Sequence, residues 1–548
     1  MYKEKTKMAK IFYPDFFNDV FGPIMQPGSS GGFAGPARIG NVAASLIGGK
    51  VKKVRFLFNP SEKEQFRTLG NFMTDRGYLG GVLGFKPDDV RLFEAHKLAK
   101  KAKVSYEFKL NHTENGHHRA LTIEVRDEQG QSGYLVGASV GGGMIRIYEV
   151  NGLRLNWQAD TYGLLVESGP KEQIGKGQEE LEANLADYIV EVYHVKGNGG
   201  RNGLFFELSK ELPLREAQSI FPECKVTVLP AVLPVVTTKD KRPQLFQTVE
   251  EWRRYAVDHG ISFVQAAIEY EKASSGWSDR EIWDYFEKIA DIFDHQIHSL
   301  EERDYIAEDT PLLPVYGKQW NEFRKKYTPI SDGLTQHILT HAYATNAKLP
   351  GVLIVPGPMG TGGGYLYSAL DAVREDRGFS HEKEIEGLIV AAALGALAYT
   401  HTNASGERGC IGESGVCNAM ASGAIAWMAS PEEPVGDPGL AVERAASMAL
   451  QANMGLVCDP IPGGLEFPCI TRTFRAAVTA PMYAEMAILG IDPLIPYHEC
   501  LQAMERHYKE TPADKLCGAN CGTCTTPTAE RCKSFLTDLM AENLSYEA

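Results

Sequence analysis

YGLLVE (162–167) is a short apolar run that begins an alternating pattern of strands and helices, and this pattern decides the fold of the middle of the chain. A polar stretch with helical spacing follows it. Two runs with strand composition then flank a Gly/Asn-rich turn, and a second helical stretch and a last strand complete the order. These segments are KEQIGKGQEELEANLAD (171–187), YIVEVYHVKG (188–197), GLFFELSK (203–210), PLREAQSIF (213–221) and KVTVLPAVL (225–233).

The resulting order, βαββαβ, is that of the ferredoxin-like unit. Residues 161–236 resemble an ACT domain, a module that often binds a small amino acid or joins two subunits. The segment carries no distinctive ligand motif, so a purely structural role is the simpler expectation. The charged, proline-containing stretch TTKDKRPQ (237–244) follows and is typical of a linker.

The chain on either side of this unit predicts further domains. Residues 118–153 alternate between apolar runs and glycine turns and predict three consecutive strands, while 61–76 and 87–103 have helical spacing. Beyond the linker, helical periodicity dominates, with long amphipathic stretches at 250–273 and 278–300. The predicted fold is α+β and multidomain: an α+β domain (1–160), an ACT-type domain (161–236), a large all-helical catalytic domain (245–510) and a cysteine-rich tail (511–548).

Composition limits the kinds of partner. A chain of 548 residues exceeds the roughly 250 to 300 residues at which single domains stop growing, and 43% hydrophobic with 23% charged residues is typical of globular proteins. The net charge of −14 argues against binding to nucleic acid and favours a small molecule or a protein as the partner.

The N-terminus lacks the apolar run of an export signal, and the apolar stretch 387–399 is shorter than the ~20 residues that span a membrane. We therefore expect a cytoplasmic location without membrane contact, and a buried helix at 387–399.

Three cysteines in the predicted helical domain stand beside glycine or proline, in ERGCIGESGVCNAM (Cys410), GLVCDPIPGG (Cys458) and LEFPCITRT (Cys469). Such turns can present thiolates to one centre. Separations of 48 and 11 residues match neither a zinc knuckle nor a ferredoxin array. The alternative for each cysteine alone is a buried structural thiol.

Several blocks resemble the bacterial iron-sulfur L-serine dehydratases in their single-chain form. The blocks are TNASGERGCIGESGVCNAMASGA (402–424), QANMGLVCDPIPGGLEFPCITRT (451–473), TNAKLPGVLIVPGPMGTGGG (345–364), GPIMQPGSSGGFAGPARIG (22–40) and GASVGGGMIRIYEVNGL (137–153). They cover nearly the whole chain in the order β-type domain, ACT-like domain, α-type domain. The resemblance implies an ammonia-lyase of amino-acid degradation, linked to gluconeogenesis, that works as a homodimer.

The resemblance also implies a cofactor and a set of site residues. Cys410, Cys458 and Cys469 would ligate a 4Fe-4S cluster whose fourth iron, free of cysteine, acts as a Lewis acid on the substrate hydroxyl. Arg472 would grip the substrate carboxylate, although a helix cap or surface ion pair is an equal alternative for it. The other substrate-binding residues implied are Ser29, Ser30, Gly360, Thr361, Gly362, Gly363 and Asn403.

The sequence departs from the family pattern at the expected general base. A histidine should follow the serine loop, but Gly31, Gly32 and Phe33 stand there. His341 and His401 are therefore the candidates for proton transfer, with His337 lying near a matching segment as well. The family's arginine-glutamate-threonine segment is kept only in part, as KET (509–511).

The tail, CGANCGTCTTPTAERC (517–532), holds Cys517, Cys521, Cys524 and Cys532. Its compact spacing suits a zinc site or a second cluster, a thiol that shields the open iron, or a redox-sensitive tail without metal.

Two alternatives to serine dehydration stay open from the sequence. The first is a related lyase for another β-hydroxy or β-substituted amino acid, such as threonine or cysteine. The second is an amino-acid sensor that has lost catalysis along with its base.

Overall fold

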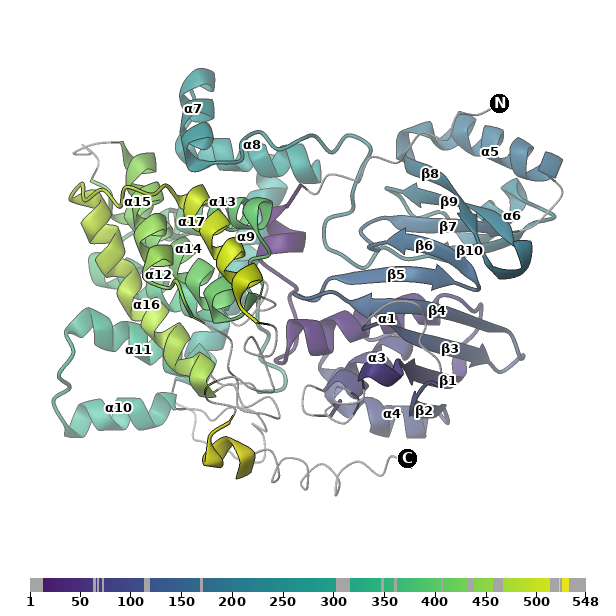
Figure 1. Ribbon diagram of the computed structural model, residues 1–548, viewed down its shortest axis with the longest axis horizontal. Helices are drawn as coiled ribbons and strands as arrows, with labels where there is room; N and C mark the ends of the chain where they lie inside the picture. Colours follow the sequence, from purple (N-terminus) through teal and green to yellow (C-terminus); the bar gives the residue numbers. More distant parts are fainter. Residues whose placement is uncertain are drawn as a thin grey trace.

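The structure is a computed structural model, drawn in Figure 1. It describes residues 13–62, 66, 69–70, 73–112, 119–167, 171–301, 316–345, 349–358, 362–405, 408–431, 437–456, 467–512, 522 and 525–531. The sheets lie on one side of the molecule and the helices of the C-terminal half lie on the other, so the fold is α+β as predicted.

The first sheet has six strands in the order β2-β1-β3-β4-β5-β6. β1 and β2 pair in parallel, and the other neighbours pair antiparallel. The three strands predicted within 118–153 are confirmed as β3, β4 and β5. The strands are β1 (Val51–Phe58), β2 (Ser105–Leu110), β3 (Leu121–Asp127), β4 (Ser132–Ser139), β5 (Ile145–Val150) and β6 (Leu153–Trp157).

The described helices of this part include α1 (Gly35–Ala44), α3 (Thr74–Val82) and α4 (Ala95–Lys101). Much of the stretch 61–76, where the sequence has helical spacing, lies outside the described residues; Phe66 is helical, and α3 begins at Thr74 after Met73 adopts a left-handed backbone with φ 57°. The position of α3 is set by its contact with α1, because a Cβ on Gly81 would lie 2.1 Å from the Ala37 carbonyl oxygen. This close crossing is a tertiary constraint that hydrophobic spacing does not contain.

The second sheet has four antiparallel strands in the order β10-β7-β9-β8. The elements follow the predicted βαββαβ order, and Leu164, Phe206 and Phe221 form the centre of the core between sheet and helices. On the other face, the Trp157 ring packs edge-on against Phe205 at 5.7 Å and joins the two sheets. The elements are β7 (Tyr162–Glu167), α5 (Lys171–Leu185), β8 (Ile189–Lys196), β9 (Asn202–Leu208), α6 (Leu214–Ile220) and β10 (Lys225–Leu229).

The C-terminal half is helical, as predicted. Ser278 caps α9 through a capping box, and the apolar stretch 387–399 is buried within α13. The stretch 250–273 is two helices rather than one, because Gly260 takes a left-handed φ of 62° and Ser262 caps the next helix. The helices are α7 (Val249–His259), α8 (Phe263–Ser275), α9 (Asp279–Leu300), α10 (Gly317–Lys326), α11 (Gly333–Thr345), α12 (Gly362–Arg377), α13 (His381–His401), α14 (Val416–Ala429), α15 (Pro438–Gln451), α16 (Phe467–Ile488) and α17 (Tyr497–Glu510).

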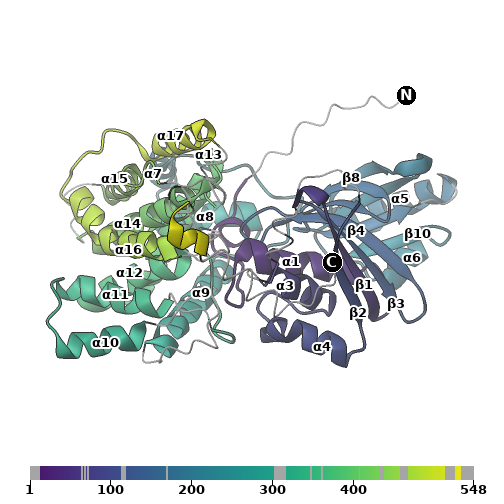
Figure 2. The same ribbon diagram turned by 60° about the horizontal axis from the view of Figure 1, so that its bottom comes forward.

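The N-terminal segment joins the two halves. Its rings enter the core of the helices: Phe16 stacks on Tyr270 at 5.6 Å, and Phe17 lies 5.1 Å from Phe286. Figure 2 shows this purple segment between the helices and the sheets. The chain then continues into the serine loop and α1, so this segment ties the serine loop to the helical half.

Within the described part of the chain, no helix is both long enough and apolar enough to cross a membrane.

Candidate active site

Cys410 lies at the start of a helical segment. It directly precedes the turn η8 (Ile411–Gly415), which continues into α14. Its side chain is buried, and its sulfur accepts a hydrogen bond of 3.1 Å from Nη1 of Arg472. A guanidinium beside a sulfur favours the thiolate, which is the form that binds metals.

Three helices begin near this sulfur. The Cys417 thiol in the first turn of α14 donates to the carbonyl of Gly362 at the start of α12 (3.2 Å), and the Tyr365 and Phe474 rings lie 5.5 Å apart in α12 and α16. Asn418 Nδ2 in α14 donates to Thr479 Oγ1 in α16 (3.2 Å). Both residues come later in the chain than the Cys410–Arg472 pair, so α14 and α16 run in the same direction. The N-terminal ends of α12, α14 and α16 thus face one region, and helix N-termini favour anions such as thiolates and carboxylates.

The other two predicted cysteine ligands are only partly visible. Cys469 is in the first turn of α16, three residues before Arg472, so its backbone lies beside the Cys410 contact. Cys458 lies outside the described residues. The described residues fit a metal group that is held by thiolates. The backbones of two of the three cysteines come together at helix N-termini, next to a positively charged side chain.

Cys417 shows that burial alone does not prepare a cysteine for this role. Burial raises the pKa of its thiol to about 12, and its sulfur donates to a carbonyl instead of accepting from a cation. Cys417 is therefore a protonated structural thiol at neutral pH.

The predicted serine loop lies near the start of α12. Ser29 caps the turn η2 (Ser30–Ala34) by accepting from Gly32 N at 3.0 Å, and Ser139 Oγ donates to the Gly31 carbonyl at 2.7 Å. The chain just before the loop pairs with the chain just before α12: Met25 and Ile354 exchange backbone hydrogen bonds of 3.0 and 2.9 Å.

The predicted glycine turn follows the end of this antiparallel pairing at which Gly22 N donates to the Pro356 carbonyl at 2.9 Å. Gly362 and Gly363 begin α12, and a Cβ on Gly363 would lie 2.1 Å from the Val355 carbonyl oxygen, so only glycine fits there. Gly360 and Thr361 lie outside the described residues. A Cβ on Gly143 would lie 3.0 Å from the Pro23 ring and 3.4 Å from the Ser30 carbonyl oxygen, so the serine loop folds back toward the paired segment that leads into α12.

Asn403 belongs to a loop that folds over the start of η8. Its Oδ1 accepts from Ser405 N at 3.0 Å, and a Cβ on Gly412 would lie 2.7 Å from the Ser405 carbonyl oxygen. The carboxylate of Glu505 in α17 anchors this loop. It accepts from Thr402 Oγ1 at 2.6 Å and from Arg408 Nε at 2.9 Å.

Sequence reasoning missed Glu505, and nothing in its sequence neighbourhood indicated this role. The partly kept segment 509–511 lies at the same place, since Lys509 Nζ is 3.3 Å from Glu505 Oε1.

His401 ends α13, two residues before Asn403. Its Nε2 donates to the Gln247 carbonyl at 2.8 Å, which leaves Nδ1 as the basic nitrogen of the neutral ring. Burial lowers the pKa of His401 below its ordinary value, so the ring is neutral near pH 7.

His341 lies elsewhere. Its ring is buried between Asp371 (Nδ1 to Oδ2, 3.3 Å) and Glu301 (Nε2 to Oε1, 3.7 Å), and burial lowers its pKa to about 3. Asp371 follows Gly362 by nine residues on α12, which is about 13 Å along the helix axis. The structure does not bring His341 to Cys410.

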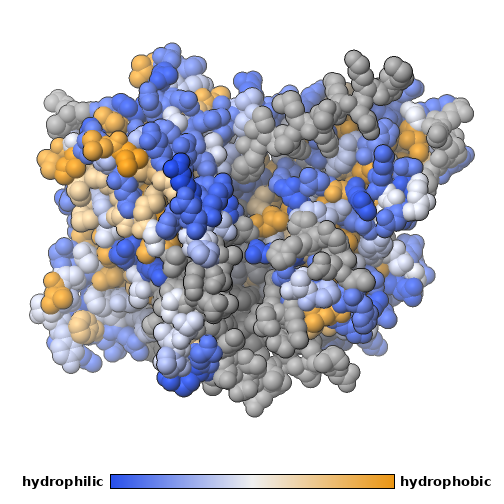
Figure 3. Space-filling model, viewed as in Figure 1, coloured by the Kyte–Doolittle hydropathy of each residue, from blue (hydrophilic) through white to orange (hydrophobic). Residues whose placement is uncertain are grey.

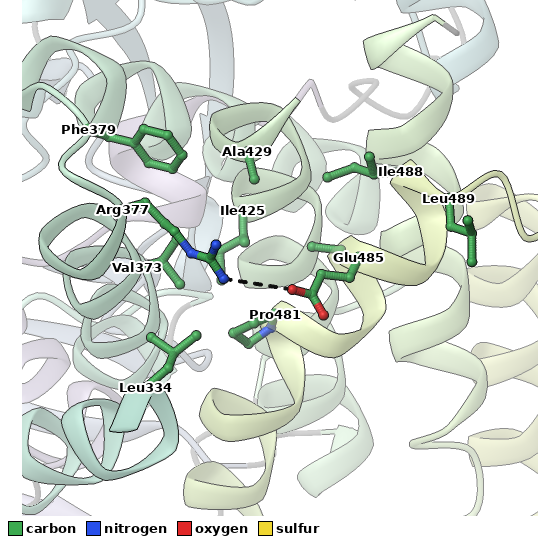
Figure 4. A pocket seen from close by; sticks show the side chains of 11 residues that line it. Leu334, Val373, Arg377, Phe379, Ile425, Ala429, Pro481, Glu485, Ile488 and Leu489 are labelled. Atoms are coloured by element: carbon green, nitrogen blue, oxygen red, sulfur yellow. Dashed lines mark ion pairs between the residues drawn. The ribbon is translucent and has the colours of Figure 1, made fainter. Parts of the chain in front are cut away.

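A cavity of about 480 Å³ opens at the other end of the same helices, and Figure 4 shows it. It lies where α12, α14 and α16 end, and it is lined mostly by aliphatic side chains with one ion pair, Arg377 to Glu485 at 4.0 Å. The described residues around it include no cysteine or histidine. Figure 3 shows hydrophobic residues gathered at the upper left of the helical half. Leu489, which lines the cavity, and Leu494 are both exposed. None of the predicted site residues lines this cavity.

Comparison with known proteins identifies the family of this chain. The family model described as serine dehydratase alpha chain matches residues 258–515. The L-serine dehydratase beta chain of Peptoniphilus asaccharolyticus is 31% identical over 200 residues, which are 36% of this chain and 88% of that protein. The alpha chain from the same organism is 25% identical over 254 residues, 45% of this chain and 83% of that protein. The L-serine dehydratase of Streptomyces coelicolor is 30% identical over 283 residues, 49% of this chain and 57% of that protein.

Proposed function

Because this chain belongs to the L-serine dehydratase family and joins beta-chain-like and alpha-chain-like segments in one polypeptide, we propose that it converts L-serine to pyruvate and ammonia. The proposed cofactor is a 4Fe-4S cluster held by Cys410, Cys458 and Cys469. The observation that carries the proposal is the Arg472–Cys410 contact at the meeting point of three helix N-termini.

The cofactor and the chain divide the work. When bound, a cluster with one iron free of cysteine supplies a Lewis acid for the β-hydroxyl of the substrate. The chain stabilises the ligand set: Arg472 offsets negative charge on Cys410, and the positive ends of η8 and α16 would do the same for thiolates at Cys410 and Cys469.

The substrate is proposed to bind between the serine loop and the start of α12. Ser29 and Ser30 come from the loop, Gly360, Thr361, Gly362 and Gly363 form the turn before and within the first turn of α12, and Asn403 comes from the loop over η8. N–H groups at a helix N-terminus suit the substrate carboxylate, and the charge of the Arg472 guanidinium favours a carboxylate nearby. The absence of side chains at the two described glycines lets a ligand approach the backbone closely.

We assign proton transfer to His401 rather than His341. His401 is two residues from Asn403, is neutral near pH 7 and keeps Nδ1 free to accept a proton. His341 lies about 13 Å from the start of α12 along the helix axis. Removal of the Cα proton with loss of the β-hydroxyl gives an enamine, which tautomerises and is hydrolysed to pyruvate and ammonia.

The proposed division into domains follows the three main cores. One core belongs to the six-stranded sheet with its helices, one to the four-stranded unit, and one to the helical half together with the N-terminal aromatic residues. We propose boundaries at 1–160, 161–236, 245–510 and 511–548, an ACT-type identity for the second domain, and a homodimer as the assembly.

The direct test is turnover by protein purified without oxygen. The proposal predicts a brown protein with about four irons per chain that releases equal amounts of pyruvate and ammonia from L-serine. L-threonine and L-cysteine, tested in parallel, identify a related lyase if either is the better substrate. Binding of an amino acid that raises the melting temperature without any turnover would instead support the sensor, which the glycines at the expected loop histidine favour.

A further inference from the structure

A second group of metal-binding side chains lies between α9, α11 and α12, away from Cys410. His337 and His341 are four residues apart on α11 and therefore lie on one face of it. Glu375 faces them from α12, which runs antiparallel to α11. One ring nitrogen of each histidine and one carboxylate oxygen of Glu375 lie within 4.8 Å of one another. Figure 2 shows α11 directly beside α12.

Arg374 orients the carboxylates of this group. Its Nη2 donates to Asp371 Oδ1 at 2.5 Å and to Glu375 Oε1 at 3.2 Å. The second oxygen of each carboxylate then faces a histidine. Glu375 Oε2 lies 3.1 Å from His337 Nε2, and Asp371 Oδ2 lies 3.3 Å from His341 Nδ1.

Two buried atoms in the group have no hydrogen-bond partner. They are His341 Nδ1 and Asp371 Oδ2, whose side chains are 1% and 0% exposed. They face each other, but not in the geometry of a hydrogen bond. Buried polar atoms are nearly always partnered, and an ion bound at the other nitrogen of His341 would fix the ring so that Nδ1–H can donate to Asp371 Oδ2.

We propose that His337, His341 and Glu375 bind a divalent transition-metal ion of the Zn²⁺ type, with Asp371 as the adjoining carboxylate. Imidazole nitrogens and a carboxylate oxygen are ligands that zinc takes, and two histidines four apart on one helix are a frequent source of them. A carboxylate against a metal-bound histidine fixes the orientation of the ring. His337 and Glu375 are 30% and 37% exposed, so the ion can enter from solvent and keep water as a further ligand.

The charges nearby favour a cation at this position. Asp294 and His298 of α9 approach Asp371 within 4.8 Å, and Glu301 lies 3.7 Å from His341 Nε2. Arg374 alone offsets the negative charge of Asp371 and Glu375, and it also lies 3.3 Å from Glu384. An ion held by α11 and α12 would tie α11 to the helix whose first residue is at the proposed substrate site.

His381 provides a matched control. It also lies between two carboxylates, with Nε2 2.6 Å from Glu287 and Nδ1 3.1 Å from Glu384. Glu287 contacts one ring nitrogen of His381 and Glu384 contacts the other, so the two carboxylates and the ring cannot bind one ion together. The variants to compare are His337→Gln, Glu375→Gln and His381→Gln, all at partly exposed positions where folding is retained.

The experiment equilibrates each full-length protein, prepared without oxygen, with Zn²⁺ alone, removes free metal by desalting, and measures zinc, iron and melting temperature. Wild type and His381→Gln should keep about one zinc ion per chain more than His337→Gln and Glu375→Gln. Zinc should also raise the melting temperature of the first two by at least ~2 °C more than that of His337→Gln and Glu375→Gln.

Zinc bound by the cysteines is common to all four proteins and cancels in the comparison. Equal zinc content and equal melting shifts in all four would overturn the proposed site. Iron content and turnover in the same samples report on the cysteine site separately, so the two proposals can fail independently.

Discussion

The two ends of the helices α12, α14 and α16 differ in the side chains that surround them. At the end where they begin, a buried cysteine accepts from an arginine, and two loops from distant parts of the chain meet. At the end where they finish, aliphatic side chains surround a cavity, and the Arg377–Glu485 pair lies in solvent. The aliphatic cavity is therefore not the better candidate for chemistry, because chemistry needs groups whose charge state and position are fixed.

The largest expected effect is at the end where the helices begin. Cys410→Ser should remove the cluster and lower turnover at least ~100-fold, because serine oxygen is a poor ligand for iron in this setting. Iron analysis and pyruvate release measure it. Cys500→Ser is the control, since burial raises the pKa of Cys500 to about 11 and keeps it a thiol. Iron retained by Cys410→Ser would remove Cys410 from the ligand set.

The next effect concerns His401. His401 must be unprotonated to remove a proton, so kcat/KM should fall as the pH is lowered. The apparent pKa of this fall should lie below 6.5, because burial lowers the pKa of the His401 ring. His401→Gln should lower kcat about 100-fold and abolish this acid limb. The pH profile checks it, with His259→Gln on exposed α7 as the control. An unchanged acid limb in His401→Gln would assign the base to another group.

A smaller effect is expected at Arg472. Arg472→Lys keeps the positive charge but loses the planar set of N–H groups, so kcat/KM should fall roughly tenfold, mainly through a higher KM. Arg475→Lys, one turn further along α16, is the control, because Arg475 bonds Asn453 rather than a cysteine. A fall of equal size in both variants would mean that Arg472 acts through helix packing.

The smallest effect is expected at the cavity. Glu485→Gln breaks an ion pair whose side chains are 54% and 74% exposed, so the free energy of unfolding should change by less than about 0.5 kcal/mol. Turnover should stay at the wild-type level. Thermal unfolding and a serine assay measure both quantities. A marked loss of turnover here would show that the two ends of the helices are coupled.

Much of the architecture could be predicted from local pattern. The strands and helices of 162–229 follow directly from their spacing and turn residues, and Ser278 begins α9 as its capping sequence predicts. The close crossing of α1 and α3 at Gly81, which decides where α3 lies, is not contained in the spacing of 61–76. The stretch 250–273 was predicted without its break, although Gly260 and Ser262 carry the signal for it.

By itself, the sequence determined which residue types can do chemistry: cysteines in glycine and proline turns, serines in a loop, and histidines on helices. Only the tertiary structure decided which of them meet. The contact of Arg472 with Cys410, the distance of His341 from the start of α12 and the pairing of Met25 with Ile354 all depend on how remote segments pack. Local spacing fixes the face of a helix on which a side chain lies, whereas its partner is set by the close packing of the core, which involves many segments at once.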